Sequence, residues 1–266
     1  MLLRQLKVLI RGAGEMASGV AVRLARARFA VLLTETPAPL CVRRTVSFCE
    51  AVHHGRVRVE DVEAELVDEP EKIGEVQTQG RLAVLVDPDL NCLPLFKPDV
   101  LVDAILAKKN LGLSTGLAEL TVALGPGFEA GSDADVVIET NRGHNLGRLI
   151  YQGQAEADTG VPGEIAGESL RRLLRSPAEG LLKANLDIGD PVYAGQMVAE
   201  VAGRPVTAQV SGVLRGLIRP GSEVRAGLKI GDVDPRGRRE FCFSVSDKAR
   251  AIGGAVLEAI LRHFNR

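Results

Sequence analysis

Aromatic side chains are scarce in this sequence, and tryptophan is absent: Phe, Trp and Tyr together make up 3% of 266 residues. This scarcity argues against a platform on which the bases of single-stranded nucleic acid stack. The net charge of −1 does not favour a strongly basic nucleic-acid binder either. We therefore expect no nucleic-acid partner.

Cysteines are also few, and none of Cys41, Cys49, Cys92 and Cys242 forms a C-x-x-C pair. This pattern gives poor support to a disulfide framework or a structural zinc site, so we expect reduced thiols, a cytoplasmic protein and no metal site. No apolar run approaches the roughly 18 residues of a membrane span. Because the first residues lead straight into a strand and a glycine motif, we expect no signal peptide.

The first half of the chain alternates short apolar runs with helical patterns, and the length predicts about two domains. Near-continuous apolar strands separated by helices are typical of a parallel sheet that is covered on both faces. We therefore predict an α/β fold with a Rossmann-like domain over residues 1–150, including a helix over 15–28. The predicted strands cover residues 7–11, 30–34, 81–86, 99–102 and 119–124.

A G-x-G-x-x-A motif, formed by Gly12, Gly14 and Ala17, directly follows the first predicted strand. In such a motif the first glycine permits a tight turn and the second lets the backbone approach a phosphate at the helix N-terminus. Glu35 ends the second strand, where an acid would accept ribose hydroxyls. A strand, the glycine motif, a helix, a second strand and an acid, in this order, predict nucleotide or dinucleotide binding. The alternative is that the glycines only turn the chain, and Glu15 beside them counts slightly against tight binding.

Charged residues follow the ends of other predicted strands. Asp103 ends a buried-looking strand and needs a partner there. Lys108 or Lys109, followed by Asn110, could supply that partner or bind phosphate; an ion pair that caps a helix is the alternative. Because ligands bind outside the carboxyl ends of the strands in open α/β sheets, these loops are candidates for a site.

Arginine and histidine side chains complete the predicted site. Arg43 and Arg44 are a candidate anion clamp, with an ordinary exposed basic face as the alternative. Arg142 and His144 lie in a polar turn after a strand that begins at 136, and His144 could transfer a proton. If the loops converge, they form a positive cleft that would suit a small anionic ligand such as a phosphorylated pterin or a pterin dinucleotide.

The second half contains a repeat. Residues 176–203 and 208–235 match at an offset of 32, each reading G-apolar-apolar and then G-x-x-V-x-A-G. This pattern resembles lipoyl and biotinyl carrier domains and predicts an inserted all-β barrel-sandwich hybrid over 176–235. The hairpin between the halves, 201–205, has no lysine, so no swinging arm is expected.

A final helix is predicted over 246–266, because Ser246 and Asp247 are N-cap types and apolar residues then recur at helical spacing. Its apolar face would dock back on the Rossmann-like domain and complete it. Gly253 and Gly254 are costly inside a helix and suggest a close approach to the sheet or to a ligand.

Taken together, the chain resembles the selenium-dependent molybdenum hydroxylase system protein family, the YqeB family. The resemblance rests on blocks between residues 12 and 261, among them GAGEMASGVAVRL, RRTVSFCEAV, VDAILAKKN, VVIETNRGHNLG and SDKARAIGGAVLEAIL. Positions that match these motifs are carried over as site residues: Gly12, Gly14, Arg43, Arg44, Asp103, Lys108, Lys109, Asn110, Arg142 and His144.

The resemblance implies an accessory or maturation factor that binds a nucleotide or a molybdenum cofactor-type ligand and serves a client molybdenum hydroxylase. It supplies no settled reaction. In the predicted mechanism, Asp103 orients Lys108 or Lys109, and His144 transfers a proton to the bound group. The alternative is an NAD(P)-dependent oxidoreductase acting on a small substrate.

Overall fold

The computed structural model describes residues 6–265 and divides into two compact units. Unit 1 comprises the chain up to Pro39, Ser47–Asp158 and the chain from Val245 onward. Unit 2 comprises Leu40–Val46 and Thr159–Ser244. Unit 2 therefore extends beyond the predicted 176–235 at both ends and includes a short segment from the first half of the chain.

Unit 1 is built on a nine-stranded sheet with the order β3-β4-β5-β2-β1-β6-β7-β8-β9. The strands from β4 to β8 in this order run parallel, and β3 and β9 add antiparallel edges. The five predicted strands each begin and end within one residue of an observed strand. The strands are β1 (Lys7–Arg11), β2 (Ala30–Glu35), β3 (Arg56–Val59), β4 (Val62–Val67), β5 (Leu82–Val86), β6 (Val100–Asp103), β7 (Leu120–Leu124), β8 (Val136–Ile138) and β9 (Leu149–Ile150).

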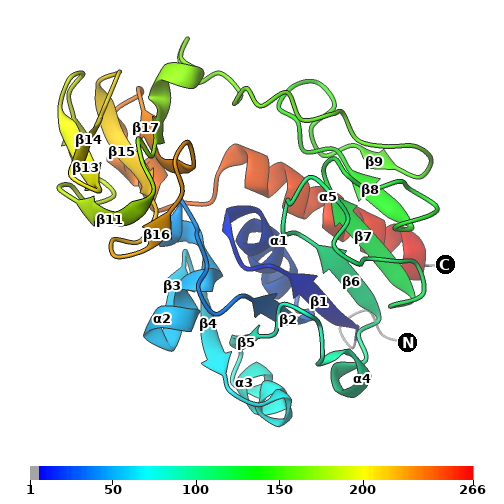
Figure 1. Ribbon diagram of the computed structural model, residues 1–266. Coiled ribbons are helices and arrows are strands. Elements are labelled where there is room, and N and C mark those ends of the chain that lie inside the picture. The colour runs from blue at the N-terminus through cyan, green and yellow to red at the C-terminus, as the bar shows by residue number, and fades with distance from the viewer. Residues whose placement is uncertain (1–5, 266) are drawn as a thin grey trace. The chain divides into compact units, whose positions relative to one another are not determined.

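Helices cover both faces of this sheet unevenly. On one face, α1 (Glu15–Arg26) and α5 (Asp247–Phe264) lie side by side (Figure 1). The other face is contacted by the short helices α3 (Ile73–Thr78) and α4 (Leu93–Phe96). The other helices within residues 6–265 are α2 (Ala51–His54) and the 3-10 turns η2 (Arg44–Val46), η3 (Phe48–Glu50), η4 (Pro70–Lys72), η5 (Leu170–Arg172) and η6 (Arg239–Cys242). Over residues 6–265, no helix combines the length and hydropathy needed to cross a membrane.

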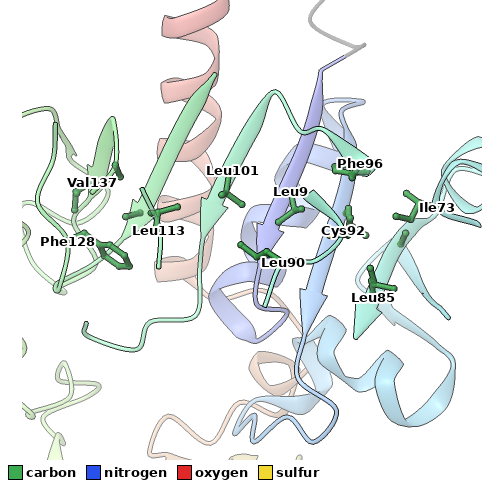
Figure 2. Close-up of a cluster of buried hydrophobic side chains, with 14 of the residues drawn as sticks. Leu9, Ile73, Leu85, Leu90, Cys92, Phe96, Leu101, Leu113, Phe128 and Val137 are labelled. Carbon is green, nitrogen blue, oxygen red and sulfur yellow. The ribbon is translucent and has the colours of Figure 1, made fainter. Parts of the chain in front are cut away.

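The connections after β6 and β7 contain no helix, although both join neighbouring parallel strands. Parallel neighbours are usually linked by a helix that covers the sheet. Here Leu113 and Phe128, from the two irregular connections, cover that face instead, together with Leu90 (Figure 2). The predicted fold class, a Rossmann-like parallel sheet with an inserted barrel-sandwich hybrid, is therefore wrong: the structure has a mixed sheet and two antiparallel sheets.

Helices α1 and α5 pack with their backbones very close together where they cross. A Cβ on Gly19 would lie 2.6 Å from the Cβ of Ala249, and one on Gly253 would lie 2.8 Å from the carbonyl oxygen of Gly19. The close approach predicted at Gly253 is therefore made to helix α1, not to the sheet or a ligand. Ser246 caps α5 as predicted, since its hydroxyl accepts a hydrogen bond from the Ala249 N–H at 3.2 Å.

Unit 2 consists of two four-stranded antiparallel sheets, β10-β17-β15-β12 and β14-β13-β11-β16. Its strands recur at the offset of 32 found in the sequence: β11, β12 and β13 begin 32 residues before β15, β16 and β17. Gly189 and Gly221 occupy matching turns with φ of 102° and 86°, which glycine adopts at no steric cost. The strands are β10 (Leu173–Arg175), β11 (Gly180–Ala184), β12 (Pro191–Val192), β13 (Met197–Val201), β14 (Arg204–Thr207), β15 (Gly212–Leu217), β16 (Glu223–Val224) and β17 (Lys229–Asp234).

Candidate functional site at the carboxyl edge of the mixed sheet

The loops that follow β1, β6 and β7 touch one another at the carboxyl edge of the sheet. A Cβ on Gly12 would lie 3.3 Å from the backbone of Ala104, the residue after β6. A Cβ on Gly127 would lie 2.5 Å from the backbone of Lys108, so the loop after β7 lies against the loop after β6. Parallel strands thus bring distant parts of the sequence to one edge, where ligands bind in open α/β sheets.

The two motif glycines have different roles. Gly12 has φ of 95° and the backbone of Ala104 beside it, so both its conformation and its surroundings require glycine. Gly14 is the N-cap of α1 with φ of −70°, and a Cβ placed on it would meet no atom within 4 Å. Any residue could adopt this conformation, and the space above it is open. The fold alone therefore does not require glycine at position 14.

Glu35 lies at the glycine loop, close to its predicted place. One carboxylate oxygen accepts a hydrogen bond from the Ala13 N–H at 2.9 Å, and the other accepts from the Thr36 N–H at 2.7 Å. The carboxylate thus already binds the Ala13 N–H, a backbone donor of the glycine loop. A ligand that uses the N–H of Ala13 must first displace Glu35.

Asp103 is buried, and its ionic partner is Arg11 rather than the predicted Lys108 or Lys109. The Arg11 guanidinium lies 3.4 Å from the carboxylate, and the Ile105 N–H donates to the other oxygen at 3.2 Å. Burial raises the pKa of Asp103 above its usual value, and these two donors offset the increase only in part. The prediction failed because Arg11 and Asp103 are 92 residues apart and meet only through the pairing of β1 with β6.

Arg11 connects three strand ends, a role that we did not predict. Besides pairing with Asp103, it donates to the carbonyl of Leu111 at 2.8 Å and to that of Pro88 at 3.0 Å. A signal was present in the sequence: Arg11 is a charged residue at the end of an apolar strand, directly before Gly12. On the neighbouring strand, the hydroxyl of Thr34 is fully buried and has no hydrogen-bond partner within residues 6–265.

The loop after β6 carries the two predicted lysines and Asn110. Lys108 is exposed and pairs with Asp158, so its ammonium is already neutralised. Lys109 is exposed, and its side chain has no hydrogen bond or ion pair within the described part of the chain. The Asn110 side chain bonds the backbone of its own loop, accepting from the N–H of Leu113 at 2.8 Å and donating to its carbonyl at 2.8 Å. Asn110 therefore shapes the loop.

The loop after β8 carries Arg142 and His144. Arg142 makes two hydrogen bonds of 2.6 and 2.8 Å to Asp247, at the N-terminus of α5, so it ties the loop to that helix. His144 is exposed, and no hydrogen bond or ion pair fixes its ring to another of the described residues. The proton-transfer role predicted for His144 thus lacks an orienting partner.

Arg43 and Arg44 belong to unit 2 and bind its backbone. Arg43 is buried and donates to the carbonyls of Phe241 at 2.8 Å and Ser244 at 3.3 Å. Arg44 donates through its Nε to the carbonyl of Leu217 at 2.7 Å. Both arginines hold segments of unit 2 together through bonds to backbone carbonyls, which is a structural role and not the predicted anion clamp.

A pocket of about 380 Å³ lies at β9 and includes Glu139, Arg148 and Glu156 in its wall. Glu139 is buried and accepts hydrogen bonds from the N–H groups of Asn141 at 2.6 Å and Glu156 at 2.7 Å. Hydrogen bonds from two asparagine amides lower the pKa of Glu156. The wall of this pocket contains none of the predicted site residues.

Two of the four thiols, those of Cys92 and Cys242, are poor candidates for nucleophiles. Burial, and then the neighbouring Asp87 carboxylate, raise the pKa of Cys92 to about 12. Burial also raises the pKa of Cys242. Within residues 6–265, no three His, Cys, Asp or Glu side chains are grouped so as to hold a metal ion.

Among known proteins, the chain has a strong match by sequence and only weak matches by structure. No family model matches it. Solved structures with some similarity include a succinylglutamate desuccinylase/aspartoacylase from Rhodobacter sphaeroides, with 14% identity, 86% of this chain and 85% of that chain covered, and a TM-score of 0.28. An aspartoacylase family protein from Mesorhizobium loti has 12% identity, the same coverage and a TM-score of 0.28. Scores this low support no conclusion on fold or activity.

The sequence similarity is much stronger. The chain is 48% identical over 254 residues to the "Uncharacterized protein YqeB" of Escherichia coli strain K12, which covers 96% of this chain and 47% of that protein. The chain thus spans about half the length of this relative. The comparison supports the YqeB part of the resemblance and leaves the link to molybdenum hydroxylases without support. The chain is thus similar to this relative over nearly all of the chain's own length.

Proposed function

We propose that unit 1 binds an anionic small ligand, a nucleotide or a phosphorylated pterin, at the carboxyl edge of its sheet, and that the chain serves a client molybdenum hydroxylase as an accessory factor. The observation that carries the first part is the open face of Gly14 at the uncapped N-terminus of α1. Helix N-termini favour anions through their free N–H groups and their dipole. A glycine that the fold does not require is explained by a ligand that approaches its backbone.

Two further features support an anion at this edge. Gly12 fixes the loop after β1 against the loop after β6, so the helix N-terminus and Lys109 belong to adjoining loops. Lys109 offers an ammonium that no described carboxylate neutralises. Glu35 opposes binding through its hydrogen bond to Ala13, which favours a ligand with enough contacts to displace it.

The accessory role rests on the resemblance of the sequence to the YqeB family. The rival oxidoreductase needs an acid or base held against a substrate. His144 has no side chain that orients it in residues 6–265, and Arg142 is bound to Asp247. A binding protein that serves another enzyme needs no such positioned group, so we prefer it.

The proposal predicts the outcome of a complementation experiment in cells that lack this chain and contain the client hydroxylase. Gly14→Val should restore hydroxylase abundance but not hydroxylase activity, because its side chain fills the space of the ligand without disturbing the fold. Gly74→Val is the matched control, since Gly74 also has open space around a Cβ but lies in α3. Full hydroxylase activity with Gly14→Val would reject the proposal.

A further inference from the structure

The loop after β6 leaves six consecutive backbone donors unused. The N–H groups of residues 106–111 form no hydrogen bond with any residue in the range 6–265. Just before them, the N–H groups of Ala104 and Ile105 are bonded, and just after them so are those of Gly112 and Leu113. These six unused donors are consecutive, and we name the stretch that carries them the 106–111 segment.

The backbone of this segment adopts a conformation that L residues seldom take. Leu106 and Lys108 have φ of 60° and 61°, so two left-handed residues flank Ala107. Successive N–H groups in alternating or turn conformations form concave anion sites known as nests. Left-handed backbone at residues other than glycine also concentrates at ligand sites, where the surrounding structure holds it in place.

Side chains and neighbouring backbone hold the segment at several points without using its N–H groups. Arg11 donates to the carbonyl of Leu111, and the Asn110 side chain bonds Gly112 and Leu113. Gly127 lies so close that a Cβ would be 2.5 Å from the carbonyl carbon of Lys108 and from the nitrogen of Lys109. The donors are thus preorganised, since the supporting contacts fix the backbone that carries them.

We propose that the 106–111 segment is an oxyanion-binding nest that takes a phosphate group, with the Lys109 ammonium as its cation. This inference deepens the proposed function, because it supplies a second anion subsite beside the helix N-terminus at Gly14. A ligand with two phosphate groups would engage both. Lys108 contributes through its backbone N–H, since its side chain pairs with Asp158.

The test is an amide chemical-shift titration of the ¹⁵N-labelled full chain with inorganic phosphate, at ionic strength held constant with chloride. The signals of residues 106–111 should shift and saturate. Lys109→Ala should weaken phosphate binding about fivefold while the same amides still respond, because one charged donor is lost and the nest remains. Lys97→Ala is the matched control: Lys97 is also exposed and left-handed, but it precedes β6.

Gly127→Ala should abolish the response of the segment, because its methyl group would displace the backbone of Lys108 and Lys109. Unchanged signals from β1 and β7 would show that this variant is folded. A wild-type titration in which residues 106–111 do not shift, or in which only residues 14–17 shift, would overturn the nest. That result, combined with lost hydroxylase activity in Gly14→Val, would retain the proposed function and reject this inference alone.

Discussion

Gly253→Ala is expected to lower the free energy of unfolding by about 2 kcal/mol, whereas Gly254→Ala should raise it by up to about 1 kcal/mol. The two glycines are adjacent in α5, so helix propensity favours alanine equally at both. The two positions differ in how closely neighbouring atoms pack around them. A Cβ on Gly253 would lie 2.8 Å from the carbonyl oxygen of Gly19, while one on Gly254 meets nothing within 4 Å.

Urea denaturation of both variants measures this difference directly. Since the contact partner of Gly253 is backbone, it cannot move aside as a flexible side chain would, and α1 and α5 must separate. Gly19→Ala should behave like Gly253→Ala, because its Cβ would lie 2.6 Å from that of Ala249. Equal stabilities for the Gly253 and Gly254 variants would refute the close crossing of the two helices.

Asp103→Ala is expected to cost about 3 kcal/mol of unfolding free energy. The substitution leaves the buried Arg11 guanidinium without its carboxylate, and an unpaired buried charge is expensive. Replacing both residues, as in Arg11→Met with Asp103→Leu, should recover a large part of the loss. A double-mutant cycle by denaturation measures the coupling, and additive effects of the two substitutions would contradict a direct interaction.

The pH dependence of Asp103 has a definite sign. Because burial raises its pKa, the folded state binds a proton more readily than the unfolded state. The contribution of Asp103 to stability is therefore full below the unfolded pKa of about 4 and declines as pH rises through the folded pKa. Asp103→Asn should lack this decline. Its stability relative to wild type should thus improve from about pH 4 to neutrality, and a constant difference would contradict the raised pKa.

The sequence predicted local structure well, because local patterns determine it. The apolar run at 7–11 and the N-cap Ser246 led to the correct strand and helix. Strand β4 was missed because it lies in the acidic segment over 61–75, which has the composition of a solvated surface. The helix-free connections were missed because parallel strands are usually joined by helices, and no periodicity in 104–119 predicted otherwise.

Only those features of the candidate site that depend on local sequence could be predicted. Gly14 and Lys109 were identified from their places after strands. Gly14 has open space above its backbone, and the ammonium of Lys109 has no partner among the described residues. Arg43 looked equally available in the sequence, but its guanidinium bonds carbonyls about 200 residues away. Such pairings depend on tertiary structure. The backbone donors of residues 106–111 could not be predicted, because an unused N–H leaves no mark on the residue type.

Native mass spectrometry of the purified full chain, beside Gly14→Val from the same cells, tests the central claim most directly. The wild-type protein should carry a phosphate-containing small molecule, or bind one when nucleotides and phosphorylated pterins are supplied. Gly14→Val should carry none and should unfold at nearly the same temperature as ligand-free wild type, because a Cβ at this position meets no atom within 4 Å. Equal ligand occupancy in both proteins, or no ligand in wild type under any condition, would contradict a binding site at the open face of Gly14.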